Sequence, residues 1–283
     1  MNNLRIGIPS KGRLAELAAE LLKEAGLSFR RQDRSLFARC REVPVDITFL
    51  RTEDIPVLCA EGAIDMGITG GDLVAEAGVE LTHRLDLGVG DCRLALCVPE
   101  DSHYHSPGEL NGARLATSFP HVTQTYLHAH GAEVHLVNLS GSVEIMVALG
   151  VADAIVDLVE TGSTLAANRL RILAEIDRYQ TVLVQNKACR HDELADRVVR
   201  RLEGVVIARS YSLLEYNVPR SKLAMAEKIT PGFKSPTISA LEDREWCAVR
   251  VMVRSGEVIE IMERLETLGA SAILETSITN CRL

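Results

Sequence analysis

The first 160 residues of the chain repeat one local pattern, in which a short apolar strand is followed by a polar loop and a helix. Leu4–Ile8 precedes a loop and a helix with apolar residues at helical spacing. Val45–Leu50 precedes the polar run 51–54, and Ala63–Thr69 precedes Gly70–Asp72 and another helix. Strands joined by helices pair in parallel, because a parallel connection has to cross over the sheet. The chain is therefore predicted to be an α/β protein with a parallel-rich sheet.

A second series of strands and helices begins near Cys92–Val98. It has strands at 113–118 and 133–137 with a helix between them. Gly62-Ala-Ile-Asp65 and Gly150-Val-Ala-Asp153 share the spacing Gly-x-x-Asp before an apolar strand. This similarity favours two like lobes with a ligand between them, at the carboxyl ends of the strands. The alternative is that Gly-x-x-Asp is ordinary turn chemistry.

The segment Asp153–Leu165 carries the most specific chemistry. A buried strand ends near Val159, a turn rich in glycine and hydroxyl groups follows, and a helix is predicted over 165–175. Backbone N–H groups and hydroxyls at a helix start form a site for a phosphate, and nearby carboxylates can hold sugar hydroxyls or a metal. The segment therefore predicts binding of a phosphorylated sugar. The same residues also fit an ordinary helix start with a Ser or Thr cap.

Charge and composition narrow the class of protein. The 283 residues carry a formal net charge of −8, which disfavours nucleic acid and membrane surfaces as partners because both are polyanionic. The 47% hydrophobic content is ample for more than one domain. The cysteines form no C-x-x-C pair and the histidines show no ligand spacing, so we expect reduced thiols and no zinc site. The chain enters its first strand directly and has no bilayer-length apolar run, which predicts a cytoplasmic protein.

The residues after 209 follow a different order of elements. Strands are predicted at 210–217, within 230–239, at 245–254 and at 270–278, with helices at 219–229 and 257–268. This is the β-α-β-β-α-β order of a ferredoxin-like domain. Small domains of this kind that are appended to biosynthetic enzymes often hold effectors.

Taken together, six segments resemble the long form of the ATP phosphoribosyltransferase family. They occur in the family's order and are Ile8–Leu14, Arg51–Pro56, Asp65–Asp72, Cys92–Leu94, Ala152–Leu165 and Thr230–Thr237. The resemblance implies transfer of the phosphoribosyl group of phosphoribosyl pyrophosphate (PRPP) to N1 of ATP, with release of pyrophosphate. This is the first step of histidine biosynthesis.

The resemblance also implies an architecture and partners. Two periplasmic-binding-protein-like lobes would comprise 1–91 with 178–209 (lobe I) and 92–177 (lobe II), and 210–283 would form a ferredoxin-like (ACT-like) regulatory domain. Mg²⁺ would bind mainly through substrate oxygens, with no protein ligand identified. Histidine would inhibit, AMP would compete, and the chain would form homo-oligomers such as dimers and hexamers.

The site residues are carried over from the family by position. The residues expected to hold PRPP are Asp157, Leu158, Val159, Glu160, Thr161, Gly162, Ser163 and Thr164. Those expected on the ATP side are Lys11, Arg13, Arg51, Asp72 and Cys92. Asp157, Glu160 and Lys11 are expected to act in catalysis. The alternative for the four charged residues on the ATP side is a solvated surface charge, and for Cys92 a small buried hydrophobe.

The resemblance places the histidine site in the C-terminal domain. Its expected residues are Asn217, Phe233, Ser235, Thr237 and Ala272. Asn217 departs from the family, which often has an acidic residue there. Because Asn forms hydrogen bonds but carries no charge, we expect histidine inhibition to be weaker or to depend differently on pH.

Three other interpretations remain at this point. Purine- and pyrimidine-type phosphoribosyltransferases also have Thr-Gly-x-Thr after a strand, but with two adjacent acidic residues, whereas Asp157 is followed by Leu158. A two-lobed sensor of anions or amino acids would need one ligand pocket, not two polyanion sites. A catalytic subunit with a separate regulatory partner would resemble the shorter family members, which lack the appended domain.

Overall fold

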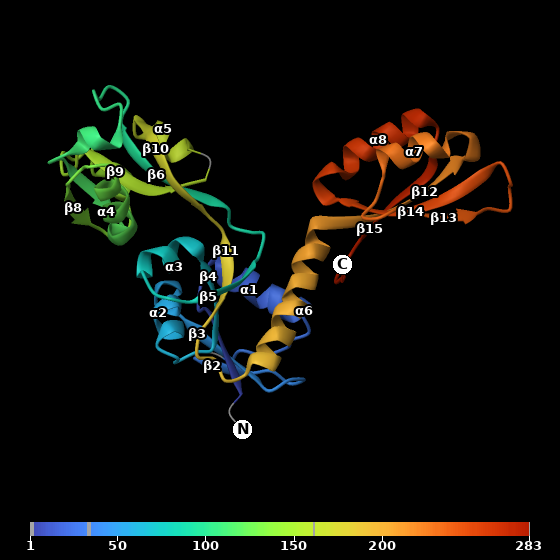
Figure 1. The fold of residues 1–283 in the computed structure, drawn as a ribbon, viewed down its shortest axis with the longest axis horizontal. Helices are drawn as coiled ribbons and strands as arrows, with labels where there is room; N and C mark the ends of the chain where they lie inside the picture. Colours follow the sequence, from blue (N-terminus) through green and yellow to red (C-terminus); the bar gives the residue numbers. More distant parts are fainter. Residues whose placement is uncertain (1–2, 33–34, 161, 283) are drawn as a thin grey trace. The chain divides into compact units, whose positions relative to one another are not determined.

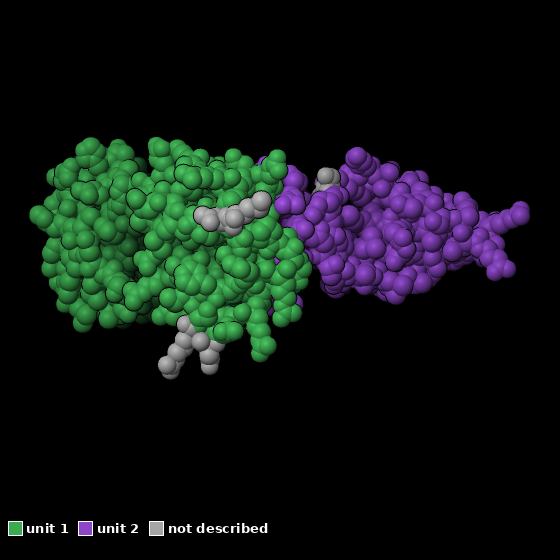
Figure 2. Space-filling view, turned by 90° about the horizontal axis from the view of Figure 1, so that it is seen from below, with its two compact units in different colours: residues 1–19, 28–195 green, residues 20–27, 196–283 purple. Residues whose placement is uncertain are grey.

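The computed structural model describes residues 3–32, 35–160 and 162–282. Residues 1–19 with 28–195 form one compact unit and residues 20–27 with 196–283 form another, and each is described by itself (Figures 1 and 2). Among the described residues, no helix combines the length and apolar character needed to cross a membrane.

The first sheet of unit 1 has six strands in the order β2-β3-β1-β4-β11-β5. Its strands are β1 (Leu4–Pro9), β2 (Phe37–Arg39), β3 (Val45–Leu50), β4 (Met66–Gly70), β5 (Thr82–Asp86) and β11 (Thr181–Gln185). β1 pairs in parallel with both β3 and β4. The helices that follow these three strands are α1 (Arg13–Glu24), α2 (Ile55–Ala60) and α3 (Gly71–Ala77). The predicted strand–loop–helix pattern is therefore confirmed.

The second sheet of unit 1 has five strands in the order β10-β6-β9-β7-β8. Its strands are β6 (Cys92–Pro99), β7 (Arg114–Thr117), β8 (His135–Asn138), β9 (Ala154–Val159) and β10 (Leu170–Tyr179), and its helices are α4 (Pro120–Ala129) and α5 (Ser163–Ala167). β7 pairs in parallel with β8 and β9, as β1 does with β3 and β4. We call the part built on the first sheet lobe I and the part built on the second lobe II. The chain passes between them twice, after β5 and between β10 and β11 (Figure 1).

The Gly-x-x-Asp repeat has the same role in both lobes. In lobe I the carboxylate of Asp65 accepts hydrogen bonds from the backbone N–H of Arg5 at 2.8 Å and from its guanidinium at 3.0 and 3.1 Å. In lobe II Asp153 accepts from the N–H of Arg114 at 2.9 Å and from its guanidinium at 2.8 and 3.2 Å. Each set of bonds joins the amino ends of two parallel neighbours. The carboxyl ends of the same strands are left for loops, which supports the two-lobe interpretation.

The helix predicted over 165–175 is wrong. α5 ends at Ala167, and Leu170–Tyr179 instead forms β10, which runs antiparallel along β6 from the pair Leu170–Pro99 to the pair Tyr179–Cys92. The residues of this segment are compatible with a helix locally. Pairing along the full length of β6 satisfies the backbone and buries Leu170 in the core of lobe II, which outweighs a weak helix propensity.

Unit 2 contains a four-stranded antiparallel sheet in the order β13-β14-β12-β15. Its strands are β12 (Tyr211–Pro219), β13 (Thr237–Ala240), β14 (Trp246–Arg254) and β15 (Ser271–Ser277), and its helices are α7 (Leu223–Ile229) and α8 (Val258–Leu268). Figure 1 shows α7 and α8 on one side of this sheet. Buried residues such as Leu214, Tyr216 and Leu265 form the core between them. The ferredoxin-like prediction is confirmed.

Unit 2 also includes most of α6 (Asp192–Ser210) and the end of α1. The guanidinium of Arg209 binds both carboxylate oxygens of Glu24 at 2.9 Å, which ties these two helices together. The expected boundaries at residues 92, 178 and 210 stay a prediction.

Replacing Asp65 with Asn should lower the free energy of unfolding by about 1–3 kcal/mol, because a buried carboxylate loses its charge beside a guanidinium and a backbone N–H. The matched control is Arg39→Gln, which removes an ion pair to Asp46 of 3.0 Å in which the arginine side chain is 76% exposed. That change should cost less than about 1 kcal/mol. Urea unfolding followed by circular dichroism measures both, and equal losses would contradict this role of Asp65.

Candidate functional site

A cleft of about 990 Å³ lies between the two lobes of unit 1. This volume is at the upper end of the range for small-molecule sites, roughly 300–1,000 Å³. Lobe I contributes Ser10, Lys11, Gly12, Arg51, Thr52, Glu53, Asp54, Asp72 and Leu73 to its lining, and lobe II contributes Ser118, Phe119, Leu139, Ser140 and Leu158.

Nearly all of these residues directly follow a parallel strand. Ser10–Gly12 follows β1, Arg51–Asp54 follows β3, and Asp72 follows β4. In lobe II, Ser118 follows β7 and Leu139 follows β8. Because parallel neighbours carry their carboxyl ends to the same edge of a sheet, each lobe presents several loops along one edge. The cleft is therefore the place where the two carboxyl edges meet.

Lys11 and Arg51 bring two cations to the lobe I wall. Lys11 lies in a tight loop in which Gly12 has a φ of 84°, a conformation that favours glycine. The N–H of Ser10 donates to the carbonyl of Leu50 at 2.7 Å, which holds this loop beside the end of β3. Both cationic side chains belong to exposed residues. The wall can thus attract an anion although the protein is acidic overall.

Asp72 is a carboxylate in the same wall and is only 8% exposed, in the first turn of α3. Burial raises the pKa of Asp72, while the backbone N–H groups of Leu73 and of Asp72 itself lower it. A Cβ at Gly70 would overlap with Oδ1 of Asp72, so the glycine leaves room for this carboxylate. A carboxylate held in this way can accept hydrogen bonds from the hydroxyl or amino groups of a ligand.

The predicted phosphate-binding segment adjoins the cleft at Leu158. Neighbouring side chains of a strand point to opposite faces. Leu158 packs with the core that contains Val156 and also lines the cleft, whereas Val159 packs with Leu165 on the other face. By this alternation Asp157 lies on the face of Val159 and Leu165. Sequence reasoning had treated Asp157 and Leu158 as one group, and strand register separates them.

The residues after β9 form a short turn. Gly162 has a φ of 81°, and Glu160, Ser163 and Thr164 are exposed. Thr161 lies outside the described residues. Because α5 is only five residues long, its dipole contributes little, and anion binding here would depend on backbone amides and hydroxyls. Among the described residues of this segment, the cleft lining includes none beyond Leu158.

Asp157 has a perturbed carboxylate. Burial is the main reason that its pKa is raised, and the negative charge of Glu144 adds to the rise. The N–H of Leu158 donates to Oδ1 at 2.8 Å, which lowers the pKa and orients the group. Such a carboxylate is a candidate for holding ribose hydroxyls.

Cys92 lies close to both sets of predicted residues. Burial raises the pKa of its thiol to about 11, and the charges of Asp72 and Glu160 contribute to that rise. The thiol is therefore protonated at neutral pH. Cys92 is within electrostatic reach of the lobe I carboxylate and of the segment after β9, but it does not line the cleft.

Sequence reasoning missed several residues of the cleft. Thr52, Glu53 and Asp54 form a 3-10 turn after β3, and Ser118 and Ser140 face them from lobe II. Their shared signal is a polar residue directly after an apolar strand. Arg13 was expected here, but it begins α1 as an exposed residue outside the lining.

The five residues expected to bind histidine are spread across the sheet of unit 2. Asn217 lies in the central strand β12 opposite Ser271, and Ala272 follows with a φ of 49°. Thr237 begins β13 at the opposite edge, with β14 between it and β12. Phe233 is 55% exposed and contacts the ring of Tyr211 at a centroid distance of 5.9 Å. Ser235 is exposed in the same loop.

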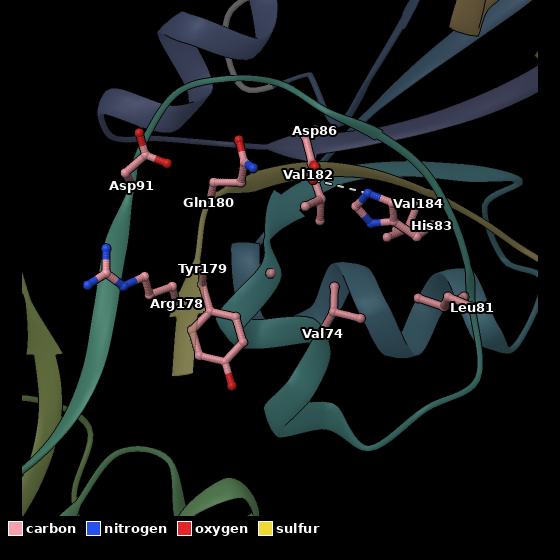
Figure 3. Close-up of a pocket in the computed structure, with 11 residues that line it drawn as sticks. Val74, Leu81, His83, Asp86, Asp91, Arg178, Tyr179, Gln180, Val182 and Val184 are labelled. Carbon is pink, nitrogen blue, oxygen red and sulfur yellow. Dashed lines mark ion pairs between the residues drawn. The ribbon is translucent and has the colours of Figure 1, made fainter. Parts of the chain in front are cut away.

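A smaller cavity of about 410 Å³ lies where the chain passes between the lobes (Figure 3). Asp91 lies in the first crossing, and Arg178 and Tyr179 end β10 at the second. Burial raises the pKa of Tyr179 to about 12. His83 and Asp86 form an exposed ion pair of 3.0 Å at one side of the cavity. The cavity is thus bordered by the two connections between the lobes.

Two family models match this chain. The family model for ATP phosphoribosyltransferase matches residues 51–204, and that for the HisG C-terminal domain matches 208–280. An ATP phosphoribosyltransferase from Rhodopirellula baltica is 68% identical over 280 residues, which cover 99% of this chain and 94% of the relative. One from Saccharopolyspora erythraea is 41% identical and covers 99% of this chain and 100% of its own length.

A solved structure gives the same assignment. The ATP phosphoribosyl transferase (HisG:HisZ) complex from Thermotoga maritima matches with a TM-score of 0.64 and 31% sequence identity, over 72% of this chain and 97% of that chain. From the family models, the full-length relatives and this structure, we conclude that the chain belongs to the ATP phosphoribosyltransferase family.

Proposed function

We propose that the cleft between the lobes is the active site for the family's reaction, with ATP against lobe I and PRPP against the segment 157–164 of lobe II. One observation supports this placement: loops after the parallel strands of both lobes line a cleft of about 990 Å³ that contains Lys11, Arg51 and Asp72 of lobe I and reaches the segment 157–164 at Leu158. Two walls with different chemistry suit a reaction that joins two substrates.

The reaction suits these groups. The lone pair of adenine N1 forms a bond to the anomeric carbon of PRPP while the bond from that carbon to pyrophosphate breaks. Positive charge develops on the ribose, where Asp157 and Glu160 would stabilise it, and Lys11 would offset negative charge on the phosphates. No covalent intermediate is needed, because holding the two substrates in line supplies much of the rate.

A divalent metal accompanies phosphoribosyl transfer in this family, and we propose that it is Mg²⁺. Among the described residues, no group of three or more His, Cys, Asp or Glu side chains is placed to hold a metal ion. Mg²⁺ does not require such a group, because it keeps several waters and binds largely through substrate phosphates. Glu53, Asp54 and Asp72 are the carboxylates in the cleft that would face it. Bound there, the ion would neutralise charge on the departing pyrophosphate.

We also propose that unit 2 binds histidine as a feedback inhibitor, that AMP competes with ATP, and that the chain forms homo-oligomers. The match of residues 208–280 to the HisG C-terminal domain supports a separate regulatory unit. The relative from Thermotoga maritima is described as a HisG:HisZ complex, which supports assembly as a property of such proteins.

Mixing the protein with ATP, PRPP and Mg²⁺ should release pyrophosphate, which a coupled assay measures. Asp157→Asn should lower kcat/KM by roughly 100-fold or more, because the developing positive charge loses one of the two carboxylates proposed to stabilise it. The matched control is Asp101→Asn, an exposed carboxylate in the turn after β6. Near-normal kinetics for Asp157→Asn would contradict the placement of PRPP on this segment.

The raised pKa of Asp157 gives a prediction about pH. If the ionised carboxylate is the active form, kcat/KM falls as pH drops through its pKa, and the midpoint lies above the ordinary value of 3.8. Glu144→Gln removes a like charge and should move this midpoint down by roughly 0.3–1 pH unit.

The wild type and Glu144→Gln use the same substrates. The titration of PRPP therefore affects both pH profiles equally, and the difference between the two midpoints reports on the protein alone. Glu100→Gln, an exposed residue of lobe II, is the control and should leave the midpoint unchanged. An unshifted profile for Glu144→Gln would show that Asp157 does not set the acid limb.

Asn217→Asp should strengthen histidine inhibition by roughly threefold to tenfold below the imidazole pKa of about 6.5, because a carboxylate pairs with the charged ring and Asn does not. Measuring the histidine concentration for half inhibition of both proteins between about pH 6 and pH 9 tests this. Identical dependence of histidine inhibition on pH in the two proteins would show that Asn217 does not contact the bound histidine.

A further inference from the structure

Arg93 lies on the same face of the lobe II sheet as Asp157. It is the second residue of β6 and stands opposite Val159 in β9, while Asp157 stands opposite Ala95. Side chains two residues apart in a strand point to the same face, so Arg93 and Asp157 are diagonal neighbours across the two strands. The turn that leads from β9 into α5 begins directly beyond Val159. Arg93 is thus beside the segment proposed to hold PRPP.

The guanidinium of Arg93 has an unused donor. Its Nε is buried and has no hydrogen-bond partner among the described residues. The carboxylate of Glu175 forms an ion pair with Nη1 at 3.9 Å, which is beyond hydrogen-bond distance and leaves Nε without a partner. Glu175 instead accepts two bonds from Arg178, at 2.7 and 3.3 Å. Buried polar nitrogens in native proteins are almost always paired, so this donor needs an explanation.

Asp157 does not supply the missing partner. Its Oδ1 accepts the N–H of Leu158 at 2.8 Å, and the neighbouring charge that acts on it is that of Glu144. Arg93 and Asp157 nevertheless both act on the buried thiol of Cys97, in opposite directions, so both charges lie near this residue. A cation and a carboxylate share one face without forming an ion pair.

We propose that Arg93 binds a phosphate group of the phosphoribosyl donor, next to the ribose held by Asp157. The proposal rests on the proposed function, because it requires PRPP on lobe II. A guanidinium is planar and presents paired N–H groups that match two phosphate oxygens, which a point charge does not. The phosphate satisfies the unused Nε and fixes the orientation of the sugar. Arg93 does not line the cleft, and it is a substrate-binding residue distinct from Lys11 and Arg51, which do.

Two substitutions test this role. Arg93→Gln removes the charge and should raise the KM for PRPP by roughly 10- to 100-fold, with the KM for ATP changed by less than about twofold. Arg93→Lys keeps the charge but loses the paired donors, and its KM for PRPP should fall between those of the other two proteins. Steady-state kinetics with each substrate varied in turn, and calorimetric titration with PRPP and Mg²⁺, measure these changes.

The matched control is Arg190→Gln, which removes one positive charge from an exposed residue in the loop before α6. It should leave both KM values unchanged, which would show that the loss of one positive charge from the protein does not by itself weaken substrate binding. A thermal unfolding midpoint recorded for each protein shows whether the fold is retained. If Arg93→Gln does not fold, Arg93→Lys decides the question, because it preserves the positive charge at this position.

A lowered unfolding midpoint with an unchanged KM for PRPP would overturn the proposal, since Arg93 would then be structural. Equal increases in the KM of both substrates would overturn it as well. Failure of the wild-type protein to release pyrophosphate would instead overturn the proposed function. If the wild type turns over and Arg93→Gln binds PRPP normally, only the assignment of Arg93 fails.

Discussion

The parallel pairing of β1 with β3 and β4, and of β7 with β8 and β9, is the constraint on which the rest of the site depends. It brings loops that are far apart in sequence to one edge of each sheet. The hydrogen bonds of Asp65 and Asp153 hold the opposite ends of the same strands in both lobes. The strands are thus held together at the ends away from the loops, and the loops at the carboxyl ends can contain polar residues. The same parallel arrangement occurs in both lobes, and their different loops give the cleft two walls of different chemistry.

Burial and position, more than overall charge, decide the electrostatics of this cleft. The chain carries a net charge of −8, yet its proposed substrates are polyanions. Lys11 and Arg51 concentrate positive charge on one wall, and the proposed role of Arg93 adds a cation beside the other. Burial raises the pKa of both Asp72 and Asp157, because a charged carboxylate is costly to remove from water. The same carboxylates remain available to sugar hydroxyls and to developing positive charge.

Much of this organisation could be predicted from the sequence. The alternation of strands and helices, the Gly-x-x-Asp repeat and the β-α-β-β-α-β order each depend on residues close together in the chain, and the structure confirms them. Lys11, Arg51 and Asp72 could be chosen by resemblance to the family, and each of them lines the cleft. The helix over 165–175 failed because the pairing of Leu170–Tyr179 with β6 is a long-range interaction that local propensity does not contain.

The sequence by itself determined the repeated strand–loop–helix pattern up to β9, the charged loops that follow those strands, and the order of elements after residue 209. Only the tertiary structure decided which of those residues share a face or a cavity. Side-chain alternation along β9 separates Leu158 in the cleft from Asp157 on the opposite face, and strand register places Arg93 beside Asp157. Strand order puts Thr237 and Ala272 at opposite edges of one sheet. The physical reason is that register couples residues far apart in sequence, and a shift of one position turns every side chain to the other face.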